Sequence, residues 1–364
     1  MTFLIFSLLT VIQLIGLYVT YNKNLLGNKN KIAVVVLIIV FVEFIIFFNI
    51  ISLSYGDDLI EYKRWFQSIV ELNFLNELST ESKGLGFSYI VYFITFFIND
   101  FNIFIFLLSC YTLIFITLLA YEFKKYIRTE SFLIVLLLFA MLLLLNRYQL
   151  GYSTNIIRSY IAGSLFILFI VFSFRNKLFL GFVPLIYFIH DMQILLGIFI
   201  VLTAYILPFR IVIWFVPLSI ISYFIGDFNA FILNISSIFI KENEIIISGL
   251  LIDDYSMTMN RKIQHFLYLI LPLLIILRKV WKKTFVFTDN KQQFFIKVMM
   301  LSLSIGILFS EITPRADRII LFGLPLLYLF FIMFSTKKEQ LFYISLIILV
   351  NYIAIYRNLN NFII

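Results

Sequence analysis

Three arginines stand where they could bind the phosphate groups of a substrate. Arg158 opens a long apolar run in NIIRSYIAG (155–163), and Arg315 and Arg318 precede a late apolar run. A guanidinium group pairs with a phosphate through two parallel hydrogen bonds, and the N–H groups at a helix start bind the same anion. We therefore predict that these arginines, with Asn155, bind a substrate phosphate. There are two alternatives. The arginine extends to water, or it forms ion pairs with neighbouring carboxylates.

One histidine lies where two apolar runs meet. The chain has 2 histidines, and His190 falls in IYFIHDMQILL (186–196). A histidine at membrane depth is costly unless it is paired or functional, and imidazole can accept a proton from a hydroxyl group near neutral pH. We predict that His190 is a general base. The alternative is a histidine that hydrogen-bonds between two helices.

Acidic residues follow the second apolar run. The stretch YGDDLIEYKRWF (55–66) holds carboxylates and a tyrosine that share or adjoin one face of a helix. Carboxylates there could orient the imidazole or act as bases themselves. The alternative is a solvated amphipathic helix on the membrane surface, with Trp65 and Phe66 in the interface. The candidates for catalysis are Asp58 and Glu61, and those for substrate binding are Asp57 and Tyr62.

A second polar stretch, LIDDYSMTMNRKIQHF (251–266), falls in the largest predicted outer loop and includes His265. Asp254 and Tyr255 are candidates there for binding a polar substrate, and an ordinary hydrated loop is the alternative. Adjacent carboxylates such as Asp253 and Asp254 point apart in a helix or strand, so their metal-binding signal is weak. We predict no metal site and no cofactor.

The elements that hold these residues must lie in a membrane. Of 364 residues, 62% are hydrophobic and 13% are charged, whereas about a quarter are charged in soluble proteins. The single cysteine, Cys110, lies in an apolar run, which excludes a disulfide framework and a cysteine-based metal site. The net charge of +8 comes from short loops between apolar runs and does not indicate nucleic acid. We predict an all-α polytopic integral membrane protein without a separate soluble domain.

Apolar runs that approach the length of a bilayer crossing recur along the chain. The first lacks the features of a cleaved signal peptide, so we interpret it as a retained span. The short segment 84–98 opens on two glycines and is re-entrant, interfacial or a full crossing. We predict one transmembrane domain over 1–364 with about 11–13 helices. The candidate spans are 3–20, 32–53, 102–121, 131–146, 156–174, 178–190, 193–208, 211–226, 262–277, 294–312, 319–334 and 341–356.

Lysines and arginines predict the orientation of these spans. If 84–98 does not cross, most of them lie on one side, which is the cytoplasm by the positive-inside rule. The opposite, outer side receives the candidate site residues and the loops at about 54–84 and 227–261. The basic loops are 21–31, 122–130, 175–177, 209–210, 278–297 and 336–340.

The order of these stretches resembles the EpsG-like, Wzy-type family of bacterial polysaccharide polymerases. The matches cover roughly residues 50–330 in the family's order. KGLGF (83–87) stands where the family has an acidic-Pro-Gly-Phe element. The other matching stretches are YGDDLIEY (55–62), with Gly56, Asp57 and Tyr62; IIRSYIAGSL (156–165), with Arg158 and Ala162; YFIHD (187–191); and PRADRIILFGLP (314–325).

The resemblance implies a metal-independent glycosyltransferase with a GT-C-like architecture at the outer face of the bacterial inner membrane. Such an enzyme moves a growing glycan from undecaprenyl diphosphate onto the next lipid-linked repeat unit, for O-antigen of lipopolysaccharide or for capsule or exopolysaccharide. Its implied partners are the undecaprenyl-diphosphate-linked donor and acceptor, membrane lipids, a chain-length regulator and a flippase, with no nucleic acid. Two other classes stay open: a lipid-linked oligosaccharide flippase or transporter, and a membrane acyltransferase that modifies sugars.

Overall fold

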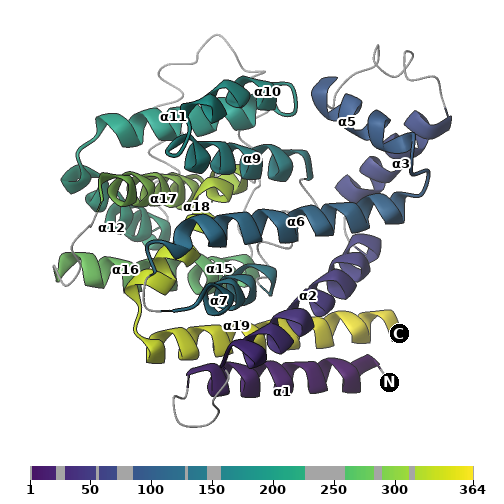
Figure 1. Cartoon of the computed structure of the whole chain (residues 1–364), viewed down its shortest axis with the longest axis horizontal. Helices are drawn as coiled ribbons and strands as arrows, with labels where there is room; N and C mark the ends of the chain where they lie inside the picture. The colour runs from purple at the N-terminus through teal and green to yellow at the C-terminus, as the bar shows by residue number, and fades with distance from the viewer. Residues whose placement is uncertain are drawn as a thin grey trace. The chain divides into compact units, whose positions relative to one another are not determined.

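The computed structural model describes residues 2–21, 29–54, 57–71, 85–127, 130–145, 157–225, 259–282, 289–310 and 316–363. Every regular element in these ranges is helical (Figure 1). Among the described residues, three helices are long and apolar enough to cross a membrane by length and composition: Phe101–Lys124, Lys262–Trp281 and Asn290–Phe309. The prediction of an all-α polytopic membrane protein is confirmed.

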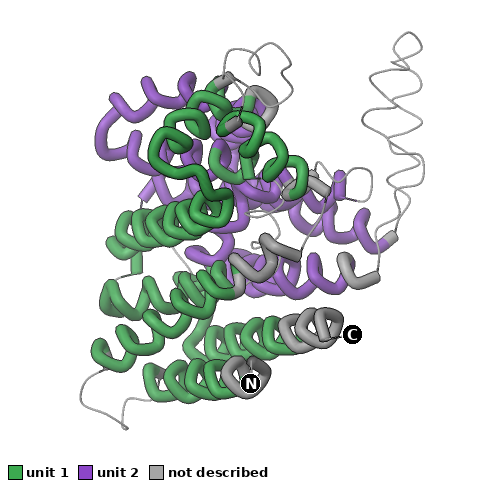
Figure 2. The backbone as a smooth tube through the Cα atoms, turned by 90° about the vertical axis from the view of Figure 1, so that its right-hand side faces the viewer, with its two compact units in different colours: residues 1–161, 188–190, 331–364 green, residues 162–187, 191–330 purple. Residues whose placement is uncertain are grey.

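The helices fall into two compact units (Figure 2). Unit 1 comprises residues 1–161, 188–190 and 331–364. It therefore contains the first turn of α9 (Ile157–Ser173) and the last turn of α18 (Ala316–Phe334). Its complete helices are α1 (Thr2–Tyr21), α2 (Lys29–Ser54), α3 (Asp57–Glu71), α5 (Leu85–Thr95), α6 (Phe101–Lys124), α7 (Phe132–Leu144) and α19 (Lys337–Ile363).

Helix α7 forms the centre of unit 1. Each residue from Ile134 to Leu144 is buried, and α2, α6 and α19 all pack against it. A helix that is apolar on every side is stable only when it is enclosed in this way. Side-chain caps fix where α6 and α7 begin: Asp100 accepts a hydrogen bond from the backbone N–H of Asn102 at 2.7 Å, and Ser131 accepts one from Ile134 at 3.4 Å.

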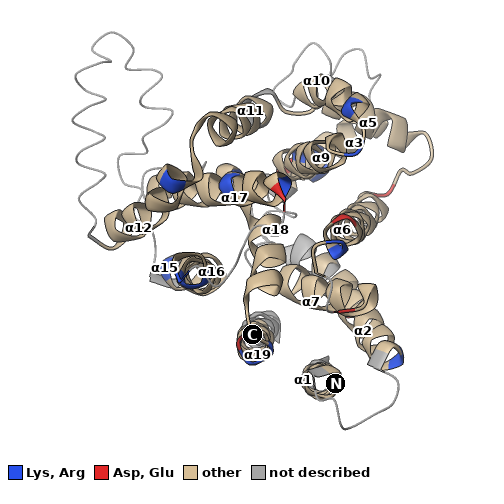
Figure 3. Ribbon diagram, turned by 60° about the vertical axis from the view of Figure 1, so that its left-hand side comes forward, with Lys and Arg blue, Asp and Glu red and all other residues tan. Residues whose placement is uncertain are grey.

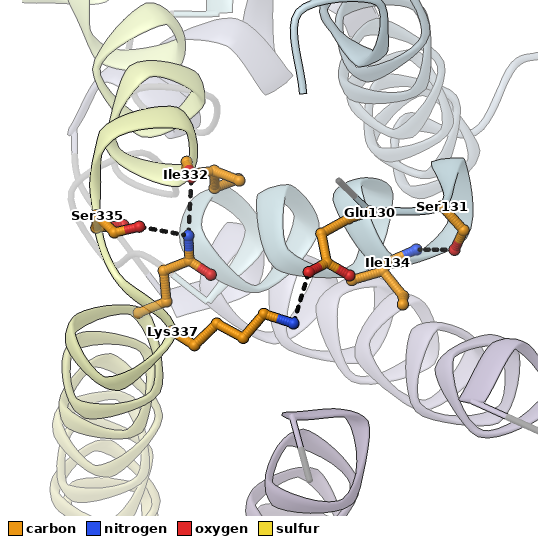
Figure 4. A network of polar contacts seen from close by, with 7 residues as sticks. Glu130, Ser131, Ile134, Ile332, Ser335 and Lys337 are labelled. Carbon is orange, nitrogen blue, oxygen red and sulfur yellow. Dashed lines mark hydrogen bonds and ion pairs between the residues drawn. The ribbon is translucent and has the colours of Figure 1, made fainter. Parts of the chain in front are cut away.

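The segment before α7 and the turn that joins α18 to α19 meet at one end of unit 1 (Figure 4). Lys337 lies 2.8 Å from the carboxylate of Glu130. The hydroxyl of Ser131 donates to the side-chain oxygen of Asn30 at 2.8 Å. Gln340 donates to two carbonyl oxygens of the preceding turn, at 2.8 and 3.3 Å. The described ends of the loops at 122–130 and 336–340 therefore lie together, and the start of α2 contacts them through Asn30.

Unit 2 comprises residues 162–187 and 191–330. In unit 2 the most extensive packing between two helices is that of α12 on α17, and α11 also packs on α17. A π-helical turn interrupts the helix that begins at Met259, where Tyr328 donates its hydroxyl to the carbonyl of Tyr268 at 3.0 Å. Unit 2 contains parts of α9 and α18. Its other elements are the 3-10 helix η1 (Lys177–Phe182), α10 (Val183–Tyr187), α11 (Asp191–Ile206), α12 (Phe209–Ile225), α15 (Met259–His265), the π turn η2 (Phe266–Ile270), α16 (Leu271–Trp281) and α17 (Asn290–Phe309).

Charged residues are rare along the described helices, and many of them stand near helix ends (Figure 3). Glu43, inside α2, is 2% exposed and accepts a hydrogen bond from the side-chain amide of Gln13 in α1. Lys297, inside α17, donates to the carbonyl of Leu207 at 3.0 Å. Polar groups at membrane depth are stable only with such partners.

Two predicted segments do not form one long helix: one is short, and the other is divided into two short helices. Within 84–98 the helix α5 has 11 residues, about 16 Å, which is half the thickness of a bilayer core. This length favours the re-entrant or interfacial interpretation over a full crossing. The predicted span 178–190 divides into η1 and α10 and ends in a turn at 188–190.

Candidate functional site

Helix α3 turns its apolar face onto α5 and α6. Phe66 is 1% exposed, and the centre of its ring lies 5.6 Å from that of Phe101 and 5.4 Å from that of Phe104. Tyr62, also buried, packs edge-on against Phe87 of α5 with ring centres 6.1 Å apart. The alternative that placed Phe66 in the membrane interface is wrong, because the protein core already covers it.

The acidic candidates lie in the first two turns of α3. Asp57 and Asp58 are its first two residues. Their side chains lie outside the described part of the structure. Glu61 lies one turn later on the exposed face, where it can reach a substrate in solution. Of the three, Glu61 is the carboxylate for which the structure describes an accessible side chain.

The N-terminal turn of α5 binds the segment that carries His190. The backbone N–H of Gly86 donates to the carbonyl of Phe188 at 2.8 Å. A Cβ atom at Gly86 would lie 2.7 Å from that carbonyl oxygen, closer than real Cβ atoms approach, so only glycine permits the contact. His190 itself is 5% exposed at the end of this turn. The imidazole is therefore buried two residues after a fixed backbone contact.

Arg158 is the second residue of α9 and is half-buried. Beside it, Tyr160 packs edge-on against Tyr111 and Phe115 of α6, with ring centres 6.3 and 6.4 Å apart. The hydroxyl of Tyr111 donates to the carbonyl of Ile161 at 3.3 Å. Tyr111 lies about 15 Å along α6 from its first residue. Arg158 therefore opens α9 beside the middle of α6, within the depth of the membrane if α6 spans it.

The first half of α6 gathers the segments that carry the candidates. Helix α3 packs on its first turn, the start of α9 packs on its middle, and α5 joins α3 to the turn before His190. His190, Arg158 and Glu61 consequently belong to one compact unit. An imidazole, a guanidinium at a helix start and an exposed carboxylate are the group types that proton removal from a hydroxyl and phosphate binding need. In Figure 1, α3 and α5 lie at the end of α6 that is far from the turn into α7.

The remaining predicted residues belong to unit 2 or lie outside the described residues. Arg318 is half-buried in α18, within unit 2. In the described ranges, no three His, Cys, Asp or Glu side chains come together as metal ligands would, and we assign no residue to a metal. Four candidates lie outside the described residues: Asn155, Asp254, Tyr255 and Arg315.

Sequence reasoning missed the roles of three residues. Gly86 lies in KGLGF, but the sequence around it cannot predict that Phe188, about a hundred positions later, packs against it. Phe87, beside it, is fully buried between Tyr62 and Trp65. His265 is not in a hydrated loop: it is fully buried in α15, and its ring stacks on Tyr223 at 6.0 Å.

The model of a family described as the EpsG family matches residues 35–363, nearly the whole chain. No curated protein matches the chain. No solved structure matches it either.

Proposed function

The chain belongs to the EpsG family, which indicates a polysaccharide-polymerase-like role in a membrane, and from that premise we propose that it is a Wzy-type polymerase. It joins oligosaccharide repeat units that are linked to undecaprenyl diphosphate, at the outer face of a bacterial inner membrane. The observation that carries this proposal is the family match over residues 35–363. The grouping of His190, Arg158 and Glu61 in one unit supports it.

Each residue has a defined part in the proposed glycosyl transfer. The oxygen of an acceptor hydroxyl attacks the anomeric carbon of the donor sugar, and His190 takes the proton of that hydroxyl. The bond from the anomeric carbon to the diphosphate oxygen breaks, and the diphosphate keeps the electron pair. The leaving diphosphate needs a cation and no proton, and Arg158 supplies the charge with two donors. The steps require no metal ion, because a guanidinium neutralises the leaving group.

Two observations support an outer-facing site. Helix α6 has 24 residues, about 36 Å, and can cross a bilayer. Helix α3 packs on its first turn, whereas the basic turns around Glu130 and Lys337 meet beyond its last residue. The positive-inside rule assigns the basic end to the cytoplasm, and α3 then lies outside.

The proposed activity is tested by deleting the gene in its bacterial host. We expect the lipid anchor and the cell surface to carry single repeat units in place of polymer, because unit synthesis and export do not need a polymerase. Restoring the gene should restore the polymer, as seen by gel electrophoresis of the glycan. If no units reach the outer face, the chain is a flippase or transporter, and polymer of normal length would contradict the proposal directly.

The orientation is tested by labelling two exposed positions in a variant without Cys110. A cysteine that replaces Lys63 of α3 should react with a membrane-impermeant maleimide in cells whose outer membrane is permeable. A cysteine that replaces Lys337, the first residue of α19, should react only after the inner membrane is opened. The reverse labelling pattern would place the site in the cytoplasm.

A further inference from the structure

Trp65 has features that its packing alone does not explain. It lies at the border between the buried and exposed faces of α3, and its side chain is partly exposed. One ring face stacks on Phe87, with ring centres 5.4 Å apart and planes 12° from parallel, and Tyr62 meets its edge. Within the described part of the chain, its indole N–H makes no hydrogen bond. The indole is thus packed on two rings while its side chain stays partly exposed.

Polar groups flank this ring along the helix. Glu61 and Ser68 stand four residues before and three residues after Trp65, so both neighbour it on the helix surface. Arg64, which directly precedes Trp65 in the chain, is exposed. A sugar ring presents an apolar C–H face and a rim of hydroxyl groups. An aromatic ring with donors and acceptors beside it matches both parts of that ligand.

Contacts connect Trp65 to the segment of the proposed base. Its stacking partner, Phe87, follows Gly86, whose N–H binds the carbonyl of Phe188, two residues before His190. We propose that Trp65 is the platform on which a pyranose ring of the acceptor glycan stacks, so that the acceptor hydroxyl is presented to His190. This inference rests on the proposed polymerase function and names the subsite for its acceptor.

The main rival role is a tryptophan that anchors α3 in the lipid headgroups. The packing of α3 argues against it. Its apolar face is covered by α5 and α6, and Phe66 is 1% exposed, so the helix needs no lipid to bury that face. The exposed residues around Trp65 are mainly polar and charged.

Intrinsic fluorescence can distinguish the two roles. The chain has 3 tryptophans, and the other two, Trp214 and Trp281, pack on each other in unit 2 with ring centres 6.1 Å apart. The double variant W214F/W281F leaves Trp65 as the sole emitter. The probe is the oligosaccharide that mild acid releases from the lipid-linked units of the deletion strain. With the protein in lipid nanodiscs, we expect the emission of Trp65 to change saturably as the concentration of this oligosaccharide rises. Maltotriose serves as the control sugar and should leave the emission unchanged, and brominated lipids should quench it weakly.

A kinetic comparison tests the same residue by substitution. With purified protein and the lipid-linked units as substrate, W65A should raise the acceptor concentration for half-maximal rate roughly tenfold, while the maximal rate changes less. W65F, which keeps a ring, should stay within about threefold of the unaltered protein. W214A is the matched control, because Trp214 is also exposed and aromatic but lies in unit 2.

Several outcomes would overturn the proposal. Strong quenching by brominated lipid without a response to the oligosaccharide would identify a membrane anchor. An unchanged half-saturating concentration in W65A would show that Trp65 only supports α3. Failure of the proposed function is recognised separately. A deletion strain that accumulates no single units would contradict the polymerase function and, with it, the acceptor subsite.

Discussion

Replacing His190 with glutamine is expected to lower the polymerisation rate by about 10²- to 10⁴-fold, the contribution of a positioned general base. Glutamine keeps a hydrogen-bond donor and an acceptor but cannot take the acceptor proton. The protein should still insert in the membrane at a normal level, because His190 ends a turn that is already held by the contact between Gly86 and Phe188. Glycan gels of the deletion strain carrying the variant should show single repeat units.

The second histidine provides the matched control for this experiment. His265 is also buried, at 0% exposed against 5% for His190, but it lies in unit 2 and stacks on Tyr223. His265→Gln should therefore keep polymer in proportion to the protein present. If His190→Gln retains near-normal polymer, His190 only bridges helices. The base would then be a carboxylate, and Glu61 and Asp58 would be tested next.

Replacing Arg158 with alanine is expected to reduce polymer formation about 10- to 100-fold. The estimate follows from the loss of a charge-assisted contact to the leaving diphosphate, which contributes roughly 1.5–3 kcal/mol. Lysine should rescue the activity poorly, because an ammonium group keeps the charge but cannot make two parallel bonds to a phosphate. Initial rates with purified protein and lipid-linked units would measure both variants.

Arg210 offers a control that matches Arg158 in its place on a helix. Each arginine is the second residue of an apolar helix, α9 or α12, but Arg210 is exposed and falls in a predicted cytoplasmic loop. Alanine at Arg210 should leave the rate within about twofold, as is usual for an exposed charge. A normal rate in Arg158→Ala at an equal protein level would remove Arg158 from the phosphate site.

Local sequence patterns were sufficient for the fold class and for most helix positions. The run of buried residues in α7 and the 24-residue helix α6 follow from apolar stretches whose length can be read directly. Caps such as Asp100 and Ser131 lie beside the helices that they begin. The order of short motifs also indicated the family that matches residues 35–363. All of these features depend on residues that are close together in the chain.

Contacts between distant residues were decided only by the tertiary structure. The periodicity of α3 does not tell whether lipid or protein covers its apolar face, and only the rings of α5 and α6 place Phe66 in the core and Trp65 at its edge. The need for glycine at position 86 appears only when Phe188 approaches it. Lys337 and Glu130 likewise meet across more than two hundred residues. Sequence determined which segments are apolar enough to enter a membrane, because transfer from water depends on each segment's own side chains. Their packing depends on shape and hydrogen bonding between segments, which no single stretch contains.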